Sequence, residues 1–94
     1  MSGRPSVRTT VTIVNKRGLH ARASAKFVET AARFQSEVTV TKGDASVSGR
    51  SIMGLMMLAA SLGSSVELAA DGPDAPAAIQ ALVTLIAARF HEDA

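Results

Sequence analysis

The chain has 94 residues, which is enough for one compact domain with a single hydrophobic core but not for two. Hydrophobic residues make up 47% of it, which favours a folded domain over a disordered chain. The absence of cysteine excludes disulfides and thiolate chemistry, and two widely separated histidines, His20 and His91, make a His/Cys metal site a poor interpretation.

The net charge of +2 conceals an uneven distribution along the chain. Residues 1–50 contain nine Lys or Arg and three Asp or Glu, whereas residues 51–94 contain one and five. An acidic partner or a phosphate group is therefore expected to bind the N-terminal half. Nucleic acid is disfavoured because the basic residues form no long run and the chain has no Tyr or Trp on which bases could stack.

Neither the interior nor the N-terminus of the chain has the sequence of a membrane or export segment. No stretch approaches the roughly 18–20 consecutive apolar residues of a bilayer-spanning helix, and residues 1–6 lack the apolar core of a signal peptide. We therefore expect a cytoplasmic protein that does not insert into a membrane. Residues 1–6 are expected to form a flexible tail, residues 7–91 a single domain and residues 92–94 a C-terminal tail.

The first two predicted elements are a strand and a helix. Alternating β-branched residues over 7–14 predict a half-buried strand with Val7, Thr9, Val11 and Ile13 on one face. A turn follows, and from Ala21 the apolar residues recur at helical spacing. The buried stripe consists of Ser24, Phe27, Val28, Ala31 and Phe34, and the outer side carries Lys26, Glu29, Thr30 and Arg33. His20 falls at the position of the helix N-cap.

The remaining elements follow in the order strand, strand, helix, strand, helix. Residues 37–41 and 45–48 predict a hairpin, Ser51 is expected to cap a short helix over 52–60 that ends by Gly63, and residues 65–70 predict another strand. Asp74 is expected to cap the last helix. Its core stripe is Ile79, Leu82, Val83, Ile86 and Phe90, with Arg89 and His91 at the C-terminal end, where cations suit the helix dipole. The order β-α-β-β-α-β-α predicts a two-layer α+β domain with its helices on one sheet face.

The stretch from Lys16 to Ser24 places one imidazole and several cations at the start of a helix. Histidine, with a reference pKa of about 6.5, is partly neutral near pH 7 and can act as a nucleophile. Backbone N–H groups at a helix N-terminus hold phosphoryl oxygens, and a guanidinium such as that of Arg22 stabilises charge during transfer. Gly18, His20 and Arg22 therefore predict an acceptor for a phosphoryl group.

Simpler and competing interpretations of the same stretch exist. A lone histidine before a helix is usually a surface residue or an ordinary N-cap, and Arg17 and Arg22 alone would be solvated charges. A hydrolase is disfavoured because Ser24 has no marked acid to complete a triad with His20, and no Walker-type loop is present. A small-ligand-binding domain lacks any sequence mark of an apolar pocket, and we expect no cofactor and no metal.

The helix after Ser51 is too short to bury every apolar side chain that it carries. Leu55 and Leu58 are expected in the core. Ile52, Met53, Met56 and Met57 either pack there as well or, where they are exposed, form an adaptable docking patch. Ser51 as an N-cap is worth on the order of 1 kcal/mol. If it were phosphorylated, about −1.5 to −2 charges would be added to this surface, and an acidic partner would be repelled.

Two motifs in the chain resemble those of a known family. Gly18-Leu19-His20-Ala21-Arg22, followed by Phe27, resembles the active-site segment of HPr, the phosphocarrier family of the phosphoenolpyruvate-dependent phosphotransferase system. Ser51-Ile52-Met53-Gly54-Leu55-Met56 is similar to the regulatory-serine segment of that family. The likeness covers nearly the whole chain after Ser6. The chain departs from the family at Ala23 and Ser24, where proline and alanine are usual.

The resemblance implies a fold and a function. The fold would be an open-faced sandwich, in which three helices cover one face of a four-stranded antiparallel sheet. His20 would take a phosphoryl group on Nδ1 from enzyme I and pass it to a IIA domain, with Arg22 steadying the group. Ser51 matches the serine that HPr kinase/phosphorylase modifies in lineages that have this enzyme. The docking surface would include Arg17, Ala21, Ile52, Met53 and Met56.

The same resemblance leaves two roles open. In the first, the protein is a monomeric phosphocarrier, a relay that is consumed and regenerated rather than a turnover enzyme. In the second, it is mainly a regulatory interaction module of a nitrogen or stress branch, which signals through its phosphorylation state instead of driving sugar uptake. The residues themselves do not discriminate between these branches.

Overall fold

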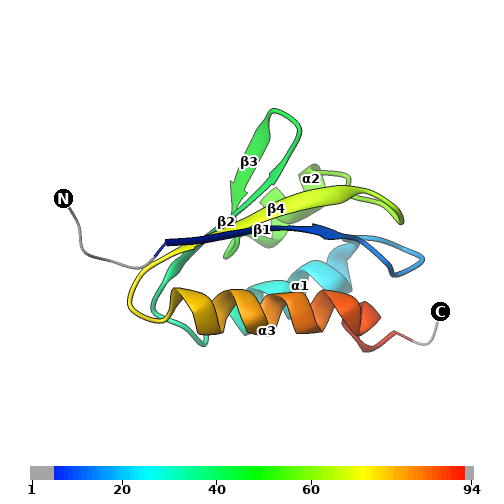
Figure 1. Ribbon diagram of the computed structural model, residues 1–94. Helices are drawn as coiled ribbons and strands as arrows, with labels where there is room; N and C mark the ends of the chain where they lie inside the picture. The colour runs from blue at the N-terminus through cyan, green and yellow to red at the C-terminus, as the bar shows by residue number, and fades with distance from the viewer. Residues whose placement is uncertain (1–5, 93–94) are drawn as a thin grey trace.

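The computed structural model describes residues 6–92, which form one antiparallel sheet with strand order β1-β4-β2-β3 and a layer of helices (Figure 1). The elements in chain order are β1 (Ser6–Thr12), α1 (Ala21–Ala31), β2 (Glu37–Lys42), β3 (Ala45–Ser48), α2 (Ile52–Met57), β4 (Ser65–Asp71), α3 (Ala75–Ala87) and a single turn, η1 (Arg89–His91). Helices α1 and α3 pack side by side beneath the sheet, and α2 contacts α1 and β3. The predicted α+β class, element order and open-faced sandwich are confirmed.

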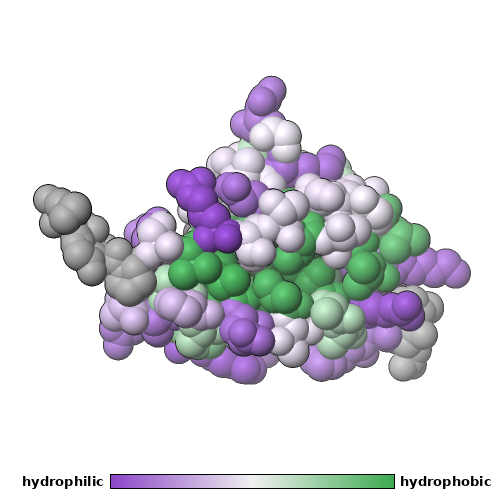
Figure 2. Space-filling view, in the orientation of Figure 1, coloured by the Kyte–Doolittle hydropathy of each residue, from purple (hydrophilic) through white to green (hydrophobic). Residues whose placement is uncertain are grey.

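The alternation predicted for the strands explains why one face of the sheet is buried. In the antiparallel register, Leu68 of β4 lies between Thr9 of β1 and Val40 of β2, so side chains of one parity share one face. That face meets the helices, whereas the opposite face carries polar residues such as Arg8 and Glu67, which form an exposed ion pair of 3.4 Å. Figure 2 shows a band of hydrophobic residues along the line where the sheet meets the helical layer.

Two helices are shorter than their apolar patterns predict. Helix α2 ends at Met57, and Ala59 just beyond it has a left-handed backbone with φ of 52°. Helix α3 ends at Ala87 although its apolar stripe predicts a helix through Phe90. The chain leaves the helix in η1, and the Phe90 ring in this turn lies in the core, where it is completely buried. Thr30, predicted on the outer side of α1, is also buried.

Asp74 stands at the start of α3 as predicted, but its carboxylate does not cap that helix. Its Oδ1 accepts hydrogen bonds from the backbone N–H (2.9 Å) and hydroxyl (2.6 Å) of Ser36, and its Oδ2 accepts one from the Gln35 N–H (2.9 Å). The Ser36 hydroxyl, followed by the Gln35 N–H, lowers the pKa of Asp74. Asp74 therefore fastens the connection between α1 and β2 to the start of α3.

The ends of the described chain differ from the predicted tails. Ser6 already belongs to β1, and Glu92 turns back toward the loop that precedes α1. The remaining residues of the two predicted tails, 1–5 and 93–94, lie outside the described residues. Within residues 6–92, none of the helices combines the length and the apolarity that crossing a bilayer requires.

Candidate functional site

The loop between β1 and α1 is fixed against the segment that follows α2. Gly18 has φ of +65°, and a side-chain carbon at this position would collide with the backbone oxygen of Ala60. The Leu19 N–H donates to that same oxygen at 2.9 Å, and the Leu19 side chain is buried. The loop that carries His20 is therefore held rigidly next to the α2 region.

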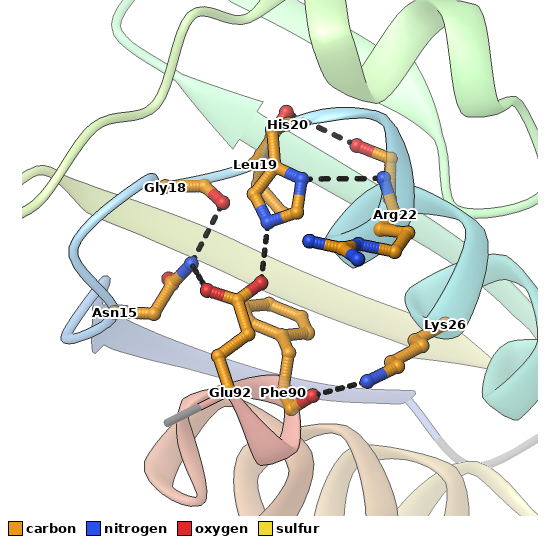
Figure 3. Close-up of polar contacts among 9 residues, drawn as sticks. Asn15, Gly18, Leu19, His20, Arg22, Lys26, Phe90 and Glu92 are labelled. Atoms are coloured by element: carbon orange, nitrogen blue, oxygen red, sulfur yellow. Dashed lines mark hydrogen bonds and ion pairs between the residues drawn. The ribbon is translucent and has the colours of Figure 1, made fainter. Parts of the chain in front are cut away.

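His20 is the N-cap of α1, as the sequence predicts. Its backbone is extended, with φ of −74° and ψ of −179°, and its carbonyl oxygen accepts the Ser24 N–H at 2.9 Å. Its ring nitrogen Nδ1 accepts a hydrogen bond from the Arg22 backbone N–H at 3.3 Å. The side chain is 13% exposed, so the ring is mostly packed while its Nδ1 edge lies at the helix N-terminus (Figure 3).

The other ring nitrogen of His20, Nε2, hydrogen-bonds Oε2 of Glu92 (Figure 3). An ionised carboxylate can only accept, so Nε2 carries the proton of the neutral ring and Nδ1 presents its lone pair. Burial tends to raise the pKa of Glu92, but the hydrogen bonds from His20 and Asn15 and the positive charge of Arg17 outweigh it. The pKa of Glu92 is lowered overall, which keeps the carboxylate ionised and supports this tautomer of His20.

Asn15 and Glu92 are site residues that the sequence does not reveal. The Asn15 amide donates from Nδ2 to Oε1 of Glu92 at 3.1 Å and to the carbonyl oxygen of Gly18 at 2.8 Å. Asn15 is completely buried. Glu92 belongs to a segment predicted as a tail, and no local pattern links either residue to His20, because their proximity arises only when the two ends of the domain meet.

The turn η1 brings Glu92 to the site through an unusual backbone. Arg89, Phe90 and His91 have φ of 57°, 54° and 61°, in the left-handed region that costs a non-glycine residue about 1–2 kcal/mol. Such a conformation persists only where surrounding contacts determine it. Here the Phe90 ring is buried and the Lys26 ammonium donates to the Phe90 carbonyl oxygen at 2.6 Å (Figure 3). The predicted favourable placement of Arg89 and His91 at a helix C-terminus is therefore replaced by a left-handed turn.

A cationic hollow lies beside His20. Arg22, Lys26, His91 and Glu92 line a shallow pocket of about 240 Å³. The Arg22 side chain is exposed and extends alongside the imidazole (Figure 3). This arrangement suits oxygens of a phosphoryl group bonded at the Nδ1 edge, because a helix N-terminus and a guanidinium both attract anions. Residues 6–92 contain no group of three or more His, Cys, Asp or Glu side chains that could hold a metal ion.

The apolar side chains in and just after α2 divide into a buried group and an exposed group, as the docking-patch interpretation of the sequence predicts. Leu55 and Leu58 are buried, whereas Met53 is 69% exposed and Ile52 and Met56 are exposed by about 40%. Exposed Met57 lies on the same helix. The simple core interpretation of Ile52, Met53 and Met56 is therefore wrong, and these three residues, called the α2 patch below, form an apolar surface.

The other predicted site residues lie near these two features. Ser51 is the N-cap of α2, and its half-buried hydroxyl accepts the Gly54 N–H at 2.9 Å. Arg17 and Ala21 are exposed on either side of His20 in the chain. Ala23 and Ser24, where the chain departs from the usual family motif, are completely buried, and the Ser24 hydroxyl donates to the Leu19 carbonyl oxygen at 3.2 Å. These departures thus face the core.

Comparison with known proteins places the chain in a family. The family model described as the PTS HPr component phosphorylation site matches residues 7–88. The chain is 55% identical over 86 residues to the phosphocarrier protein HPr of Neisseria meningitidis, which covers 92% of this chain and 97% of that protein. It is 43% identical over 82 residues to the phosphocarrier protein NPr of Shewanella violacea, covering 87% of this chain and 90% of that one.

A solved structure agrees with this assignment. The crystal structure of HPr-C-His from Thermoanaerobacter tengcongensis superposes with a TM-score of 0.89 at 46% identity, covering 94% of this chain and 99% of that chain. A family match over nearly all of residues 6–92, relatives above 50% identity and the shared fold all point the same way. The chain therefore belongs to the HPr family of phosphocarrier proteins of the phosphotransferase system.

Proposed function

We propose that His20 is the phosphoryl-carrying residue, which accepts the group on Nδ1 from phospho-enzyme I and passes it to a IIA domain. The observation that carries this proposal is the state of the His20 ring. Its Nε2 is engaged by Glu92, so the lone pair of Nδ1 is the nucleophile and lies at the N-terminus of α1. Enzyme I as donor and a IIA domain as acceptor are inferred from the family, whose phosphotransferase partners they are.

The transfer step needs no proton to leave the nucleophile. The Nδ1 lone pair forms a bond to phosphorus, the bond between phosphorus and the donor atom of enzyme I breaks, and its electron pair returns to that atom. The ring then carries a positive charge, with its proton on Nε2, beside the negative phosphoryl group. The Arg22 guanidinium and the N–H groups at the start of α1 stabilise the phosphoryl oxygens during transfer.

The role of a carrier follows from what the site contains. His20 receives the group and must lose it again before another cycle, so the protein acts as a relay and not as an enzyme that releases a product. The position of Nδ1 at the N-terminus of α1 suits this task, because a group bonded there has to reach partner proteins. We propose that the protein does this as a monomer in the cytoplasm.

The α2 patch is proposed as the surface on which enzyme I and IIA domains dock, together with Arg17 and Ala21. Support comes from its exposure and from its position, since the loop before His20 is hydrogen-bonded to Ala60 just after α2. Ser51 at the start of α2 is proposed as a regulatory phosphorylation site for an HPr kinase/phosphorylase. A phosphate there would add negative charge to the docking surface while the helix N-terminus tolerates it.

The experiment that tests this function is phosphorylation by enzyme I and phosphoenolpyruvate. The wild-type protein should acquire one acid-labile phosphate, and the His20→Ala variant should acquire none. The His91→Ala variant is the matched control, because it removes the other histidine of the chain. Labelling of the His20→Ala variant at the wild-type level would refute the proposal.

A second candidate function is a regulatory role in a nitrogen or stress branch. The observation that favours it is the 43% identity to a phosphocarrier protein named NPr. The two branches differ in the acceptor, so the test offers the phosphorylated protein to IIA domains of a sugar branch and of a nitrogen branch. Faster transfer to the sugar-branch domain supports the uptake role, and faster transfer to the nitrogen-branch domain supports the regulatory role.

A further inference from the structure

The His20 ring is held by two residues from distant parts of the chain. Asn15 lies in the loop between β1 and α1, and Glu92 follows the turn η1. The Glu92 carboxylate uses one oxygen for His20 Nε2 and the other for the Asn15 amide. Two hydrogen bonds therefore connect the three side chains in the order amide, carboxylate and imidazole (Figure 3).

The orientation of the Asn15 amide is fixed by its partners. Both groups that it contacts, the Gly18 carbonyl oxygen and the Glu92 carboxylate, can only accept, so Nδ2 must face them. Its Oδ1 is then buried, with no hydrogen-bond partner among the described residues. A buried acceptor without a partner is uncommon and unfavourable, so its presence indicates that both amide protons are needed where they are.

The position of Glu92 is equally determined. Three consecutive left-handed residues precede it, and they are held by the buried Phe90 ring and by Lys26 on the Phe90 carbonyl oxygen. Strain of this kind concentrates at functional sites, where the surroundings maintain it. The Glu92 side chain is only 14% exposed, so its contact with His20 is not that of a mobile surface residue.

We propose that Glu92, held by Asn15, is a positioning residue for phosphoryl transfer, an inference that rests on the proposed carrier role of His20. Glu92 keeps the proton on Nε2, so that Nδ1 is unprotonated when the donor arrives. It then stabilises the positive charge that the ring gains once Nδ1 is bonded to phosphorus. The same logic operates where a buried carboxylate orients a catalytic histidine and stabilises its imidazolium form.

Glu92 is the negative group at the ring, and the other charged groups nearby are cationic. The His91 imidazole from η1 lines the same pocket, and Arg22 and Lys26 from α1 and Arg17 from the loop carry positive charge around the site or act on Glu92. These cations favour the phosphoryl dianion but disfavour a positive ring. Glu92 therefore supplies the opposite charge that the ring requires, and it does so on the side away from Nδ1.

The test compares Glu92→Gln and Glu92→Ala with the wild-type protein. Glutamine can still accept the Nε2–H through its amide oxygen, but it carries no charge and turns its NH2 group toward the Asn15 amide, whereas alanine removes both the acceptor and the charge. Proton NMR should show an exchange-protected His20 Nε2–H signal in wild type and in Glu92→Gln, and none in Glu92→Ala. The rate of phosphorylation by enzyme I should fall about tenfold in Glu92→Ala, a change of ~1.4 kcal/mol in the barrier, and by less in Glu92→Gln.

The matched controls are Glu67→Gln and Glu67→Ala. They make the same chemical changes at a carboxylate that pairs with Arg8 on the polar face of the sheet, so neither the signal nor the rate should change. Far-UV circular dichroism verifies the fold of each variant. If Glu92→Ala fails to fold, the slower rate of the nearly isosteric Glu92→Gln carries the test.

Three outcomes would overturn the proposal: a protected signal that persists in Glu92→Ala, wild-type transfer rates in folded Glu92→Ala, or a wild-type rate in Glu92→Gln. Failure of the proposed function looks different. If enzyme I does not label His20 in the wild-type protein, the carrier role is refuted, while the NMR comparison still shows whether Glu92 holds the ring. If His20 is labelled normally and only the Glu92 variants behave as wild type, the carrier role stands and the positioning role is refuted.

Discussion

The His20 site and the α2 patch lie next to each other but are built in opposite ways. The site joins Asn15, His20 and Glu92 from both ends of the domain and is largely buried. The α2 patch comes from one short helix and is exposed. The reacting group is thus held by long-range contacts, whereas the surface proposed to meet partners needs only local structure. Changes at the site should therefore affect the transfer step, and changes in the patch should affect binding.

Among variants that keep His20, the largest effect is expected from Arg22→Ala. The guanidinium lies beside the His20 ring at the cationic hollow, and loss of one such stabilising group costs about 10²–10³-fold in rate where it is fully engaged. Because Arg22 is exposed, we expect a fall in the transfer rate of about 10–100-fold with little change in the affinity for enzyme I. Rapid-quench kinetics with enzyme I measures both quantities, with Arg33→Ala as control, since Arg33 is an exposed guanidinium that pairs with Glu29. An unchanged transfer rate in Arg22→Ala would show that Arg22 does not act in the transfer step.

A change in the α2 patch should have the opposite signature. Met53→Glu places a charge on the most exposed residue of the patch. We expect the KM for enzyme I to rise about tenfold, which is ~1.4 kcal/mol of binding, while the maximal transfer rate stays near wild type. Gln80→Glu, which adds the same charge at an exposed position of α3, is the control. If Met53→Glu alters only the maximal rate, the division between the two regions does not hold.

Ser51→Asp should lower the rate of phosphorylation at His20 severalfold by adding negative charge to the docking surface. The fold should be retained, since aspartate is a good N-cap for α2. Ser51→Ala is the matched control and should keep the transfer rate while losing about 1 kcal/mol of stability with the cap to Gly54. Equal phosphorylation rates for Ser51→Asp and wild type, with matching far-UV spectra, would argue against a regulatory serine.

The pH dependence of stability should report the two lowered carboxyl pKa values. Asp74 and Glu92 have a lower pKa in the folded protein than their ordinary values of 3.8 and 4.5. Their contribution is therefore complete above these ordinary values and is lost as the pH falls through the folded-state pKa. The difference in unfolding free energy between wild type and Asp74→Asn should shrink as the pH is lowered below about 4. Asp44→Asn, in the exposed β2–β3 turn, serves as control; a pH-independent difference for Asp74→Asn would contradict the assignment.

The smallest effect is expected in the turn η1. His91 has φ of 61°, which glycine adopts without strain, so His91→Gly should stabilise the protein by about 0.5–1 kcal/mol. His91→Ala keeps a side-chain carbon in the left-handed region and should give no such gain. Thermal unfolding of the two variants measures the difference. A lower stability for His91→Gly than for His91→Ala would show that the backbone of η1 is not strained.

The sequence predicts the fold well because its signals are local. Strand alternation, the N-cap positions of His20 and Ser51 and the stripe through Phe27 depend on residues a few positions apart, and all are confirmed. The errors fall where tertiary contacts override local preference. Phe90 follows the helical stripe, yet its burial is achieved through a left-handed turn.

The candidate site divides in the same way. Gly18, His20 and Arg22 lie within five residues of the chain, so their chemistry could be inferred from the sequence. Asn15 and Glu92 could not, since an asparagine after a strand and a glutamate near the C-terminus are both ordinary. Their role depends on the packing of η1 beneath the start of α1, which no periodicity encodes.

The most direct test of the account locates the phosphorus atom on the ring. The protein labelled with ¹⁵N in its histidine rings is phosphorylated by enzyme I, and phosphorus–nitrogen coupling is measured by NMR. If Nδ1 of His20 is the nucleophile, coupling is expected to this atom, with the proton still on Nε2 opposite Glu92. Coupling to Nε2, or phosphate on any residue other than His20, would contradict it.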